Sequence, residues 1–131
     1  MSKPSGTGNR RPLRVLVADD DPEITALVAA SFKKWRIYCI NAHDGATAIH
    51  LARTLRPDVL VLDVMMPDLD GFGVLRLLKQ DKRTRRIKII LLTSCDEATD
   101  IMRGFRLGAD DYLTKPFAPV ELATRVKMIS Y

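Results

Sequence analysis

An uninterrupted aliphatic run, Val59-Leu60-Val61-Leu62, ends at a single carboxylate, Asp63. A run this apolar predicts a strand that is buried on both faces, as the strands of a parallel sheet are. A carboxylate at the end of such a strand loses hydration, which is costly unless a metal ion, a cation or hydrogen bonds compensate. The run therefore predicts a parallel sheet with a compensated acid at its edge.

A similar pattern occurs near the N-terminus, where the run 13–18 leads directly into Asp19 and Asp20. If the two predicted strands are neighbours, their three carboxylates converge at one end of the sheet. Neighbouring carboxylates repel each other without a cation, and Mg²⁺ accepts hard oxygen ligands while keeping several waters. The acids therefore predict a divalent-cation site, which suits phosphate chemistry.

Short aliphatic runs alternate along the chain with segments whose apolar residues recur at helical spacing. Strands are predicted at 13–18, 36–41, 58–62, 87–92 and 110–113. Helices are predicted at 22–34, 43–55, 71–81, 97–107 and 119 to about 130. Asp21 can cap the first helix, and Gly108 suits the end of the fourth. This alternation predicts an α/β fold, with a doubly wound five-stranded parallel sheet and right-handed crossovers.

Further candidate residues follow the later strands, at the edge where parallel sheets bind ligands. Thr93 and Ser94 follow the fourth predicted strand, and Lys115 follows the fifth. A lysine ammonium beside carboxylates suits pairing with a phosphoryl oxygen, although most lysines are simply surface residues. Thr93 either caps the next helix or donates, with the following backbone N–H, to an anion at that helix start. Tyr112 is also compatible with a plain core position.

The 131 residues fit one domain, and a composition of 47% hydrophobic and 28% charged residues argues against disorder. No apolar stretch approaches the roughly 18–20 residues of a membrane span, and the polar N-terminus has no signal-peptide core. We predict a flexible tail at 1–12 and a single domain at 13–131. Cys39 and Cys95 match no metal-site spacing, which predicts reduced thiols and a cytoplasmic protein.

The net charge is +5 although the predicted site is acidic, so the positive charge lies elsewhere. It collects in two groups, Arg10, Arg11 and Arg14, and then Lys82, Arg83, Arg85, Arg86 and Lys88. A solvated loop after a helix explains the second group. A nucleic-acid patch is the alternative, which the lack of interleaved aromatic residues and of any recognition motif disfavours.

Four segments, in order, resemble the receiver domain of two-component response regulators. They are Val17-Ala18-Asp19-Asp20-Asp21, Val61-Leu62-Asp63-Val64-Met65-Met66-Pro67 with Asp70-Gly71, Leu91-Leu92-Thr93-Ser94, and Gly108-Ala109-Asp110-Asp111-Tyr112-Leu113-Thr114-Lys115-Pro116-Phe117. Each segment alone is a weak signal, but four in register make a specific match over nearly the whole chain from Leu13. The resemblance implies a flavodoxin-like fold with strand order 2-1-3-4-5.

The resemblance also implies roles for the acidic residues. Asp63 would be the phosphoacceptor, which attacks a phosphohistidine or a small phosphodonor. Mg²⁺ would be bound by Asp20, Asp63 and the Met65 backbone carbonyl, with Asp19 acting through a water. These roles suit phosphoryl transfer, which needs in-line positioning of the reacting groups and neutralisation of their charge.

Once the phosphoryl group is attached, the resemblance implies that Lys115 holds one of its oxygens. Thr93 and the backbone of Ser94 would hydrogen-bond the same group. Tyr112 would swing inward as Thr93 moves, and this switch would alter the surface around the fourth helix and fifth strand. The chain would catalyse only its own phosphorylation and dephosphorylation, and would otherwise be no enzyme.

The implied partners are a histidine kinase or phosphotransfer protein and a downstream output domain or partner protein, with no membrane and no direct nucleic-acid contact. Some receivers form homodimers through the fourth helix, fifth strand and fifth helix. Asp111, Glu121 and Arg125 match that face, and Asp111 with Arg125 could form one inter-subunit pair. Ile101 stands where that mode of dimerisation expects an arginine, which leaves the homodimer open.

Two other functions fit part of this pattern. A phosphatase of the haloacid-dehalogenase type also uses an Asp nucleophile, Mg²⁺, Thr and Lys, but wants Asp-x-Asp-x-Thr or Val after its first strand. Here Asp19-x-Asp21 is followed by Pro22-Glu23, and the chain is short for that fold. A degenerate receiver would act as a phosphorylation-independent protein-binding module, which is disfavoured because no site residue is missing.

Overall fold

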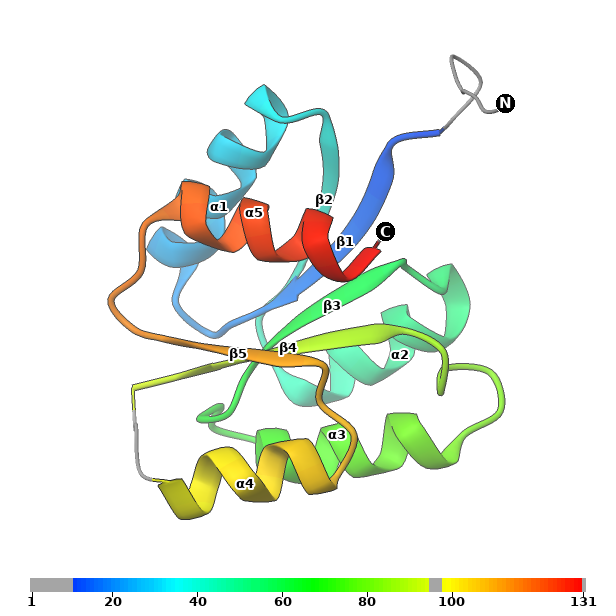
Figure 1. The fold of residues 1–131 in the computed structure, drawn as a ribbon. Coiled ribbons are helices and arrows are strands. Elements are labelled where there is room, and N and C mark those ends of the chain that lie inside the picture. Colours follow the sequence, from blue (N-terminus) through cyan, green and yellow to red (C-terminus); the bar gives the residue numbers. More distant parts are fainter. Residues whose placement is uncertain (1–10, 95–97, 131) are drawn as a thin grey trace.

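The computed structural model describes residues 11–94 and 98–130 and contains one five-stranded parallel sheet (Figure 1). The strands are β1 (Leu13–Ala18), β2 (Ile37–Ala42), β3 (Val59–Asp63), β4 (Lys88–Thr93) and β5 (Asp111–Thr114). Their order across the sheet is β2-β1-β3-β4-β5, and every neighbouring pair is parallel. The doubly wound, flavodoxin-like prediction is confirmed, although β2 to β5 each begin one residue later than predicted.

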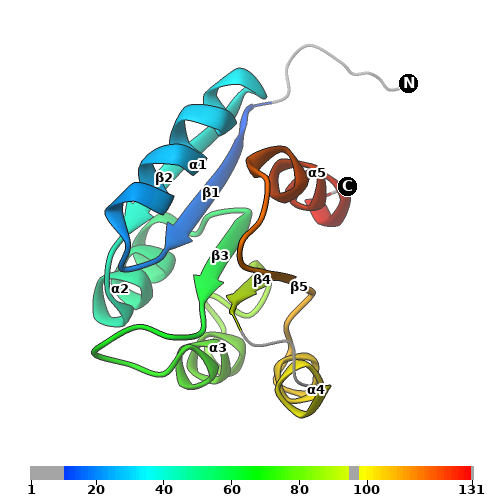
Figure 2. The same cartoon turned by 90° about the vertical axis from the view of Figure 1, so that its left-hand side faces the viewer.

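In the described part of the chain, five helices connect and cover the strands. They are α1 (Pro22–Lys34), α2 (Gly45–Leu55), α3 (Gly71–Gln80), α4 (Ala98–Arg106) and α5 (Pro119–Ser130). Helices α1 and α5 cover one face of the sheet, and α2, α3 and α4 lie on the other (Figure 2). The result is a three-layered domain whose strands all end at one edge.

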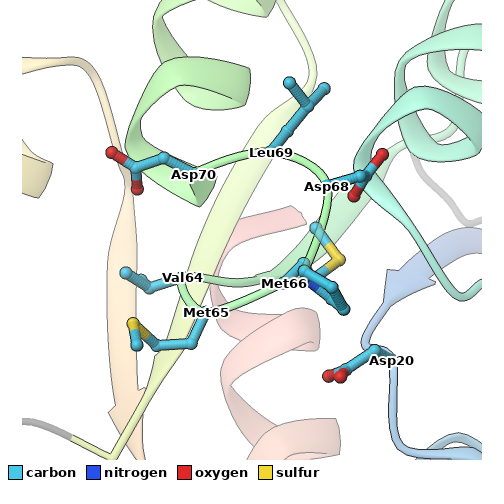
Figure 3. Close-up of a pocket in the computed structure, with 8 residues that line it drawn as sticks. Asp20, Val64, Met65, Met66, Asp68, Leu69 and Asp70 are labelled. Carbon is cyan, nitrogen blue, oxygen red and sulfur yellow. The ribbon is translucent and has the colours of Figure 1, made fainter.

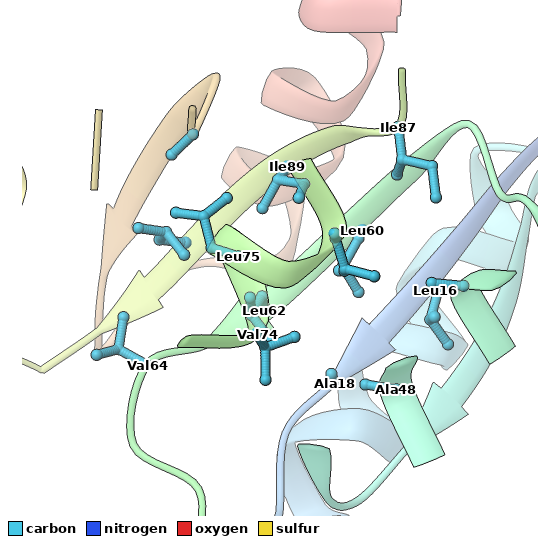
Figure 4. Packing of buried hydrophobic residues seen from close by; sticks show 14 of the residues in the cluster. Leu16, Ala18, Ala48, Leu60, Leu62, Val64, Val74, Leu75, Ile87 and Ile89 are labelled. Carbon is cyan, nitrogen blue, oxygen red and sulfur yellow. The ribbon is translucent and has the colours of Figure 1, made fainter. Parts of the chain in front are cut away.

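Alternate residues of the central strands face the two helical layers. Leu16, Leu60 and Leu62 join the cluster beneath α2 and α3 (Figure 4), whereas Val17 and Val61 join the cluster beneath α1 and α5. Every residue of β3 is buried, which confirms the strand predicted from its aliphatic run. Burial of each such side chain contributes roughly 1.5–3 kcal/mol, so the sheet holds its carboxyl edge in a fixed shape.

Single residues fix where α1 begins, where α4 ends and how closely α4 packs on the sheet. Asp21 caps α1, since its Oδ1 accepts a hydrogen bond of 2.9 Å from the Glu23 amide. Gly108 follows α4 with φ +110°, a conformation that suits glycine at a helix end. Gly104 is unfavourable within a helix on propensity alone, but a Cβ built there would lie 2.6 Å from Leu91 Cδ1. Glycine therefore lets α4 approach β4 closely.

Several predictions concern the ends and surface of the chain. Of the predicted tail 1–12, the structure describes Arg11 and Pro12. Cys39 is a free, half-buried thiol whose burial raises its pKa to about 11, whereas Cys95 lies outside the described residues. Lys82 is exposed in the turn after α3, as expected for a solvated loop. Within 11–94 and 98–130, no helix combines the length and apolar character that a membrane crossing requires.

Candidate functional site

The carboxyl ends of β1 and β3 lie side by side, where the strand order reverses. Strand β1 pairs with β2 on one side and with β3 on the other. The chain therefore runs from β1 to β2 in one direction across the sheet and continues from β3 to β5 in the opposite direction. Ligands of open α/β sheets bind at this kind of switch point. The loop after β1 brings Asp19 and Asp20 to this point, and β3 ends there at Asp63.

The three carboxylates form one compact group. Asp19, Asp20 and Asp63 each offer one oxygen, and these oxygens all lie within 4.8 Å of one another. Asp19 and Asp63 are buried, with exposed fractions of 0% and 3%, while Asp20 is exposed. Oxygen ligands that converge in this way, with one side open to water, fit a hard divalent cation such as Mg²⁺.

Lys115, which follows β5, supplies a positive charge to this group. Its Nζ lies 2.9 Å from Asp19 Oδ2 and donates a hydrogen bond of 3.3 Å to Asp63 Oδ2. Burial alone would lower the pKa of Lys115, but the close contact with Asp19 and the charges of Asp63 and Asp19 raise it. The ammonium therefore stays charged between the two buried acids.

Backbone amides complete the environment of the acids. Asp19 Oδ1 accepts a hydrogen bond of 2.9 Å from the Asp21 amide, and Asp63 Oδ1 accepts one of 3.0 Å from the Met65 amide. Asp19 Oδ2 is buried, and among the described residues it accepts no well-formed hydrogen bond despite its ion pair with Lys115. This oxygen has unused capacity, which a cation or a metal-bound water would use.

Asp63 has a pKa above its ordinary value. Desolvation by burial is the largest cause, and the charge of Asp19 acts in the same direction. The Met65 amide and Lys115 act in the opposite direction but do not cancel the rise. The environment therefore disfavours the ionised form of Asp63. A bound cation would stabilise that form.

The exposed side of the site opens into a cavity of about 430 Å³ (Figure 3). Asp20 and the loop between β3 and α3 line this cavity, and Met65 of that loop is 71% exposed. Of the three grouped acids, Asp20 lines the cavity and is open to water. Met65 and Asp20 therefore line the same cavity.

The predicted switch residues lie on β4 and β5. Thr93 ends β4 and is 7% exposed, and its carbonyl accepts a hydrogen bond of 2.8 Å from the Lys115 amide. Tyr112 packs edge-to-face against Phe105 of α4, with ring centroids 5.8 Å apart. Thr93 and Tyr112 line one small cavity beneath α4, and Ser94 follows Thr93 at the strand end. The helix start expected after Ser94 falls on residues 95–97, outside the described part of the chain.

The residues of the predicted dimer face contact each other within one chain. Arg125 Nη1 donates hydrogen bonds of 2.9 Å to both carboxylate oxygens of Asp111. Arg125 Nη2 also lies 3.9 Å from Glu121 Oε2, one helical turn away. An inter-subunit pair between Asp111 and Arg125 would therefore have to replace or share this intrachain pair.

Two residues with contacts near the site, Asp68 and Arg103, were not predicted from the sequence. Asp68 accepts hydrogen bonds from the first amides of α2, and Arg103 of α4 lies over the Phe72 ring. The other site residues were predicted because they follow strands, whereas neither Asp68 nor Arg103 lies at a strand end. Their partners are distant in sequence, so spacing alone offered no indication.

A family model for the response regulator receiver domain matches residues 15–127, which include all the residues grouped at the strand ends. The chain belongs to the response regulator receiver domain family. This receiver domain is 44% identical over 116 residues to the alkaline phosphatase synthesis transcriptional regulatory protein PhoP of Bacillus subtilis. It is 41% identical over 116 residues to the DNA-binding dual master transcriptional regulator RpaA of Synechocystis.

Both alignments cover 88% of this chain but 48% of the relative. The receiver domain thus spans about half the length of these curated relatives. Solved structures agree on the fold: a Francisella response regulator receiver domain superposes with TM-score 0.84 at 38% identity, covering 90% of this chain and 96% of that one. A response regulator from Chloroflexus aurantiacus gives TM-score 0.85 at 32% identity, covering 91% and 98%.

Proposed function

We propose that this receiver domain accepts a phosphoryl group on Asp63, in a reaction that depends on Mg²⁺, and so acts as a phosphorylation switch. The observation that carries the proposal is the position of Asp63, which is buried at the end of β3 and held between Lys115 and two further acids. A purely structural ion pair would need one acid for one lysine. Three acids around one lysine leave negative charge for a cation to neutralise.

In the proposed reaction, a carboxylate oxygen of Asp63 attacks the phosphorus of a phosphohistidine or a small phosphodonor. The bond between phosphorus and the donor atom breaks, and the donor leaves with that electron pair. An acyl phosphate forms on Asp63, and attack by water on phosphorus later restores the carboxylate. Lys115 is positioned to pair with a phosphoryl oxygen through the ammonium that contacts Asp63 in the free protein.

The residues that would hold Mg²⁺ are Asp20, Asp63 and the backbone carbonyl of Met65, with Asp19 contributing through a water. When bound, Mg²⁺ supplies neutralisation of the phosphoryl and carboxylate charges during transfer. The convergent oxygens support this assignment, as does Asp19 Oδ2, which pairs with Lys115 but accepts no well-formed hydrogen bond among the described residues. Of the chain's own residues, Lys115 and the Met65 amide would orient the acceptor and favour its ionised form.

The signal would leave the site through Thr93 and Tyr112. A dianion on Asp63 offers the Thr93 hydroxyl and the Ser94 amide a new acceptor, which can bias a two-state element. Thr93 and Tyr112 line one small cavity of about 10 Å³, so an inward Tyr112 ring would need Thr93 and its neighbours to shift first. That movement would break the present contact between Tyr112 and Phe105 and change the surface of α4 and β5.

The proposed phosphodonor is a histidine kinase or a phosphotransfer protein. The proposed downstream partner, which responds to the phosphorylated domain, is an output domain or partner protein. A transcriptional output is supported by the two relatives, PhoP and RpaA, which are transcriptional regulators. A homodimer through Asp111, Glu121 and Arg125 and a cytoplasmic location remain predictions. Sedimentation with and without the phosphoryl group would test the dimer.

Intact mass measured after incubation with acetyl phosphate and MgCl₂ tests the proposal. We expect one added phosphoryl group in the wild-type protein and none in Asp63→Asn or without metal. An adduct that persists in Asp63→Asn would refute the acceptor. No adduct in wild-type protein that binds Mg²⁺ would favour the degenerate receiver, which signals by contact alone.

A further inference from the structure

The loop between β3 and α3, residues 64–70, has little apolar burial to fix its shape. Val64 and Met66 are buried at its beginning, with exposed fractions of 8% each, but 67–70 are all exposed. Exposed segments with few buried contacts open easily. Because this loop carries the Met65 carbonyl, its position matters for the proposed metal site.

Hydrogen bonds within the loop close its base. Met65 and Asp70 form an isolated antiparallel bridge, and the Gly71 amide donates a hydrogen bond of 2.9 Å to the Val64 carbonyl. Asp70 Oδ1 accepts one of 3.1 Å from the Phe72 amide and so caps α3. These bonds fix the shape of the turn but do not attach the loop to helix α2.

Asp68 makes that connection. Its Oδ1 accepts a hydrogen bond of 2.8 Å from the Gly45 amide, and its Oδ2 accepts one of 3.1 Å from the Ala46 amide. These are the first two amides of α2, which have no partner within the helix and lie at the positive end of its dipole. Both oxygens of a charged acceptor thus join the loop to a helix 22 or 23 residues away in sequence.

An apolar contact lies beside these hydrogen bonds. A Cβ built at Gly45 would be 2.7 Å from Leu69 Cβ, so glycine at this position lets the loop lie directly on the helix. Helix α2 is itself fixed, because Ala48 and Ala52 have exposed fractions of 0%. The loop is therefore attached to a rigid element of the core.

Asp68 is not the N-cap of α2. That role belongs to Asp44, whose Oδ1 accepts a hydrogen bond of 2.7 Å from the Thr47 amide. The first turn of α2 thus has two carboxylates, one from its own segment and one from the β3–α3 loop. This duplication offers a matched comparison, because the two acids differ in whether they hold the loop.

We propose that Asp68 is a positioning residue of the metal site, which holds the Met65 carbonyl in place by fastening the β3–α3 loop to α2. The inference rests on the proposed function, since it concerns the same Mg²⁺ site. Groups that orient metal ligands without touching the metal typically change its affinity about 10- to 100-fold when they are removed. We expect Asp68→Ala to weaken Mg²⁺ binding about tenfold, at the lower end of that range.

Isothermal titration calorimetry with MgCl₂ on the full chain tests this proposal. The matched control is Asp44→Ala, which removes the same charge from the same helix end but leaves the loop attached. We expect the dissociation constant to rise about tenfold in Asp68→Ala and to stay within about twofold in Asp44→Ala. Equal rises in the two variants, or no rise in Asp68→Ala, would overturn the proposal.

A second variant separates position from charge. Gly45→Ala keeps every charge but displaces Leu69, so we expect weaker Mg²⁺ binding here as well. Unchanged binding in Gly45→Ala would show that Asp68 acts by electrostatic attraction alone and would overturn the positioning role. Circular dichroism confirms folding of each variant, and Asp68→Asn, which keeps one acceptor, replaces Asp68→Ala if the latter fails to fold.

The wild-type protein distinguishes this inference from the proposed function. Wild-type protein that binds Mg²⁺ but forms no phosphoryl adduct would refute phosphoacceptance, while the comparison of Asp68 and Asp44 variants would still decide the positioning role. Wild-type protein that binds no Mg²⁺ would overturn both.

Discussion

The guanidinium of Arg103 lies 4.4 Å from the centre of the Phe72 ring, so a cation–π contact joins helix α4 to helix α3. Arg103 also lies 3.9 Å from Asp70 in an exposed ion pair, which contributes little on its own. The cation–π contact therefore ties α4, whose surface would change on phosphorylation, to the first turn of α3.

Removal of this contact should loosen α4. We expect Arg103→Ala to lower the free energy of unfolding by about 1 kcal/mol, measured by urea denaturation, because cation–π contacts at partly exposed sites contribute about that much. Arg103→Lys keeps the charge and should retain part of the stability. Equal losses in the two variants would argue against the cation–π contact as the cause.

Lys115 should stabilise the metal-free protein by compensating two buried acids. Removal of one partner of a fully buried pair costs about 3–5 kcal/mol, and we expect about 2 kcal/mol for Lys115→Ala because part of its side chain reaches water. MgCl₂ should recover stability in this variant more than in wild type, since a cation replaces the lost charge. Lys82→Ala, on the exposed turn after α3, should change neither quantity.

Gly104 should be required for the close approach of α4 to β4. A Cβ at Gly104 would lie 2.6 Å from Leu91 Cδ1, whereas a Cβ at Gly73 of α3 would meet nothing within 4 Å. We expect Gly104→Ala to cost about 1–3 kcal/mol through overpacking. Gly73→Ala should stabilise by about 0.5–1 kcal/mol through helix propensity, as thermal unfolding would show. A stabilising Gly104→Ala would contradict the packing account.

Asp58 should make stability depend on pH at the opposite edge of the sheet. Partial burial alone would raise its pKa, but the hydrogen bonds from Arg11 and the Arg14 amide lower it below the ordinary value of 3.8. Ionised Asp58 therefore favours the folded state. This stabilisation is complete above the unfolded-state pKa and is lost as the pH falls through the folded-state pKa.

Asp58→Asn should remove that dependence. At neutral pH we expect a loss of about 0.5–1 kcal/mol, a small value because the Arg11 side chain is 61% exposed and solvent screens the pair. The difference from wild type should shrink as the pH falls below about 4. A double-mutant cycle with Arg11→Ala measures the pair itself, and a difference that grows with acidification would refute this account.

The order of helices and strands was predictable because it depends on local periodicity. Aliphatic runs such as 59–62 and helical spacing such as that of 22–34 are properties of neighbouring residues, and the structure reproduces their positions to within one or two residues except for α4, whose predicted start lies outside the described chain. The carboxyl end of each strand could likewise be read directly. The positions of Asp63, Asp19 and Lys115 at strand ends are therefore evident from the sequence.

The order of residues alone is enough to show that acids and a lysine follow buried strands, and hence that a charged site lies at one edge of the sheet. The packed fold is needed to show that Lys115 is shared between Asp19 and Asp63, and that Asp68 reaches the first amides of α2. Such contacts join residues far apart in sequence, and their partners depend on how twisted strands and packed helices bring loops together. Periodicity identifies the elements, but a distance of about 3 Å between two side chains exists only once those elements have packed.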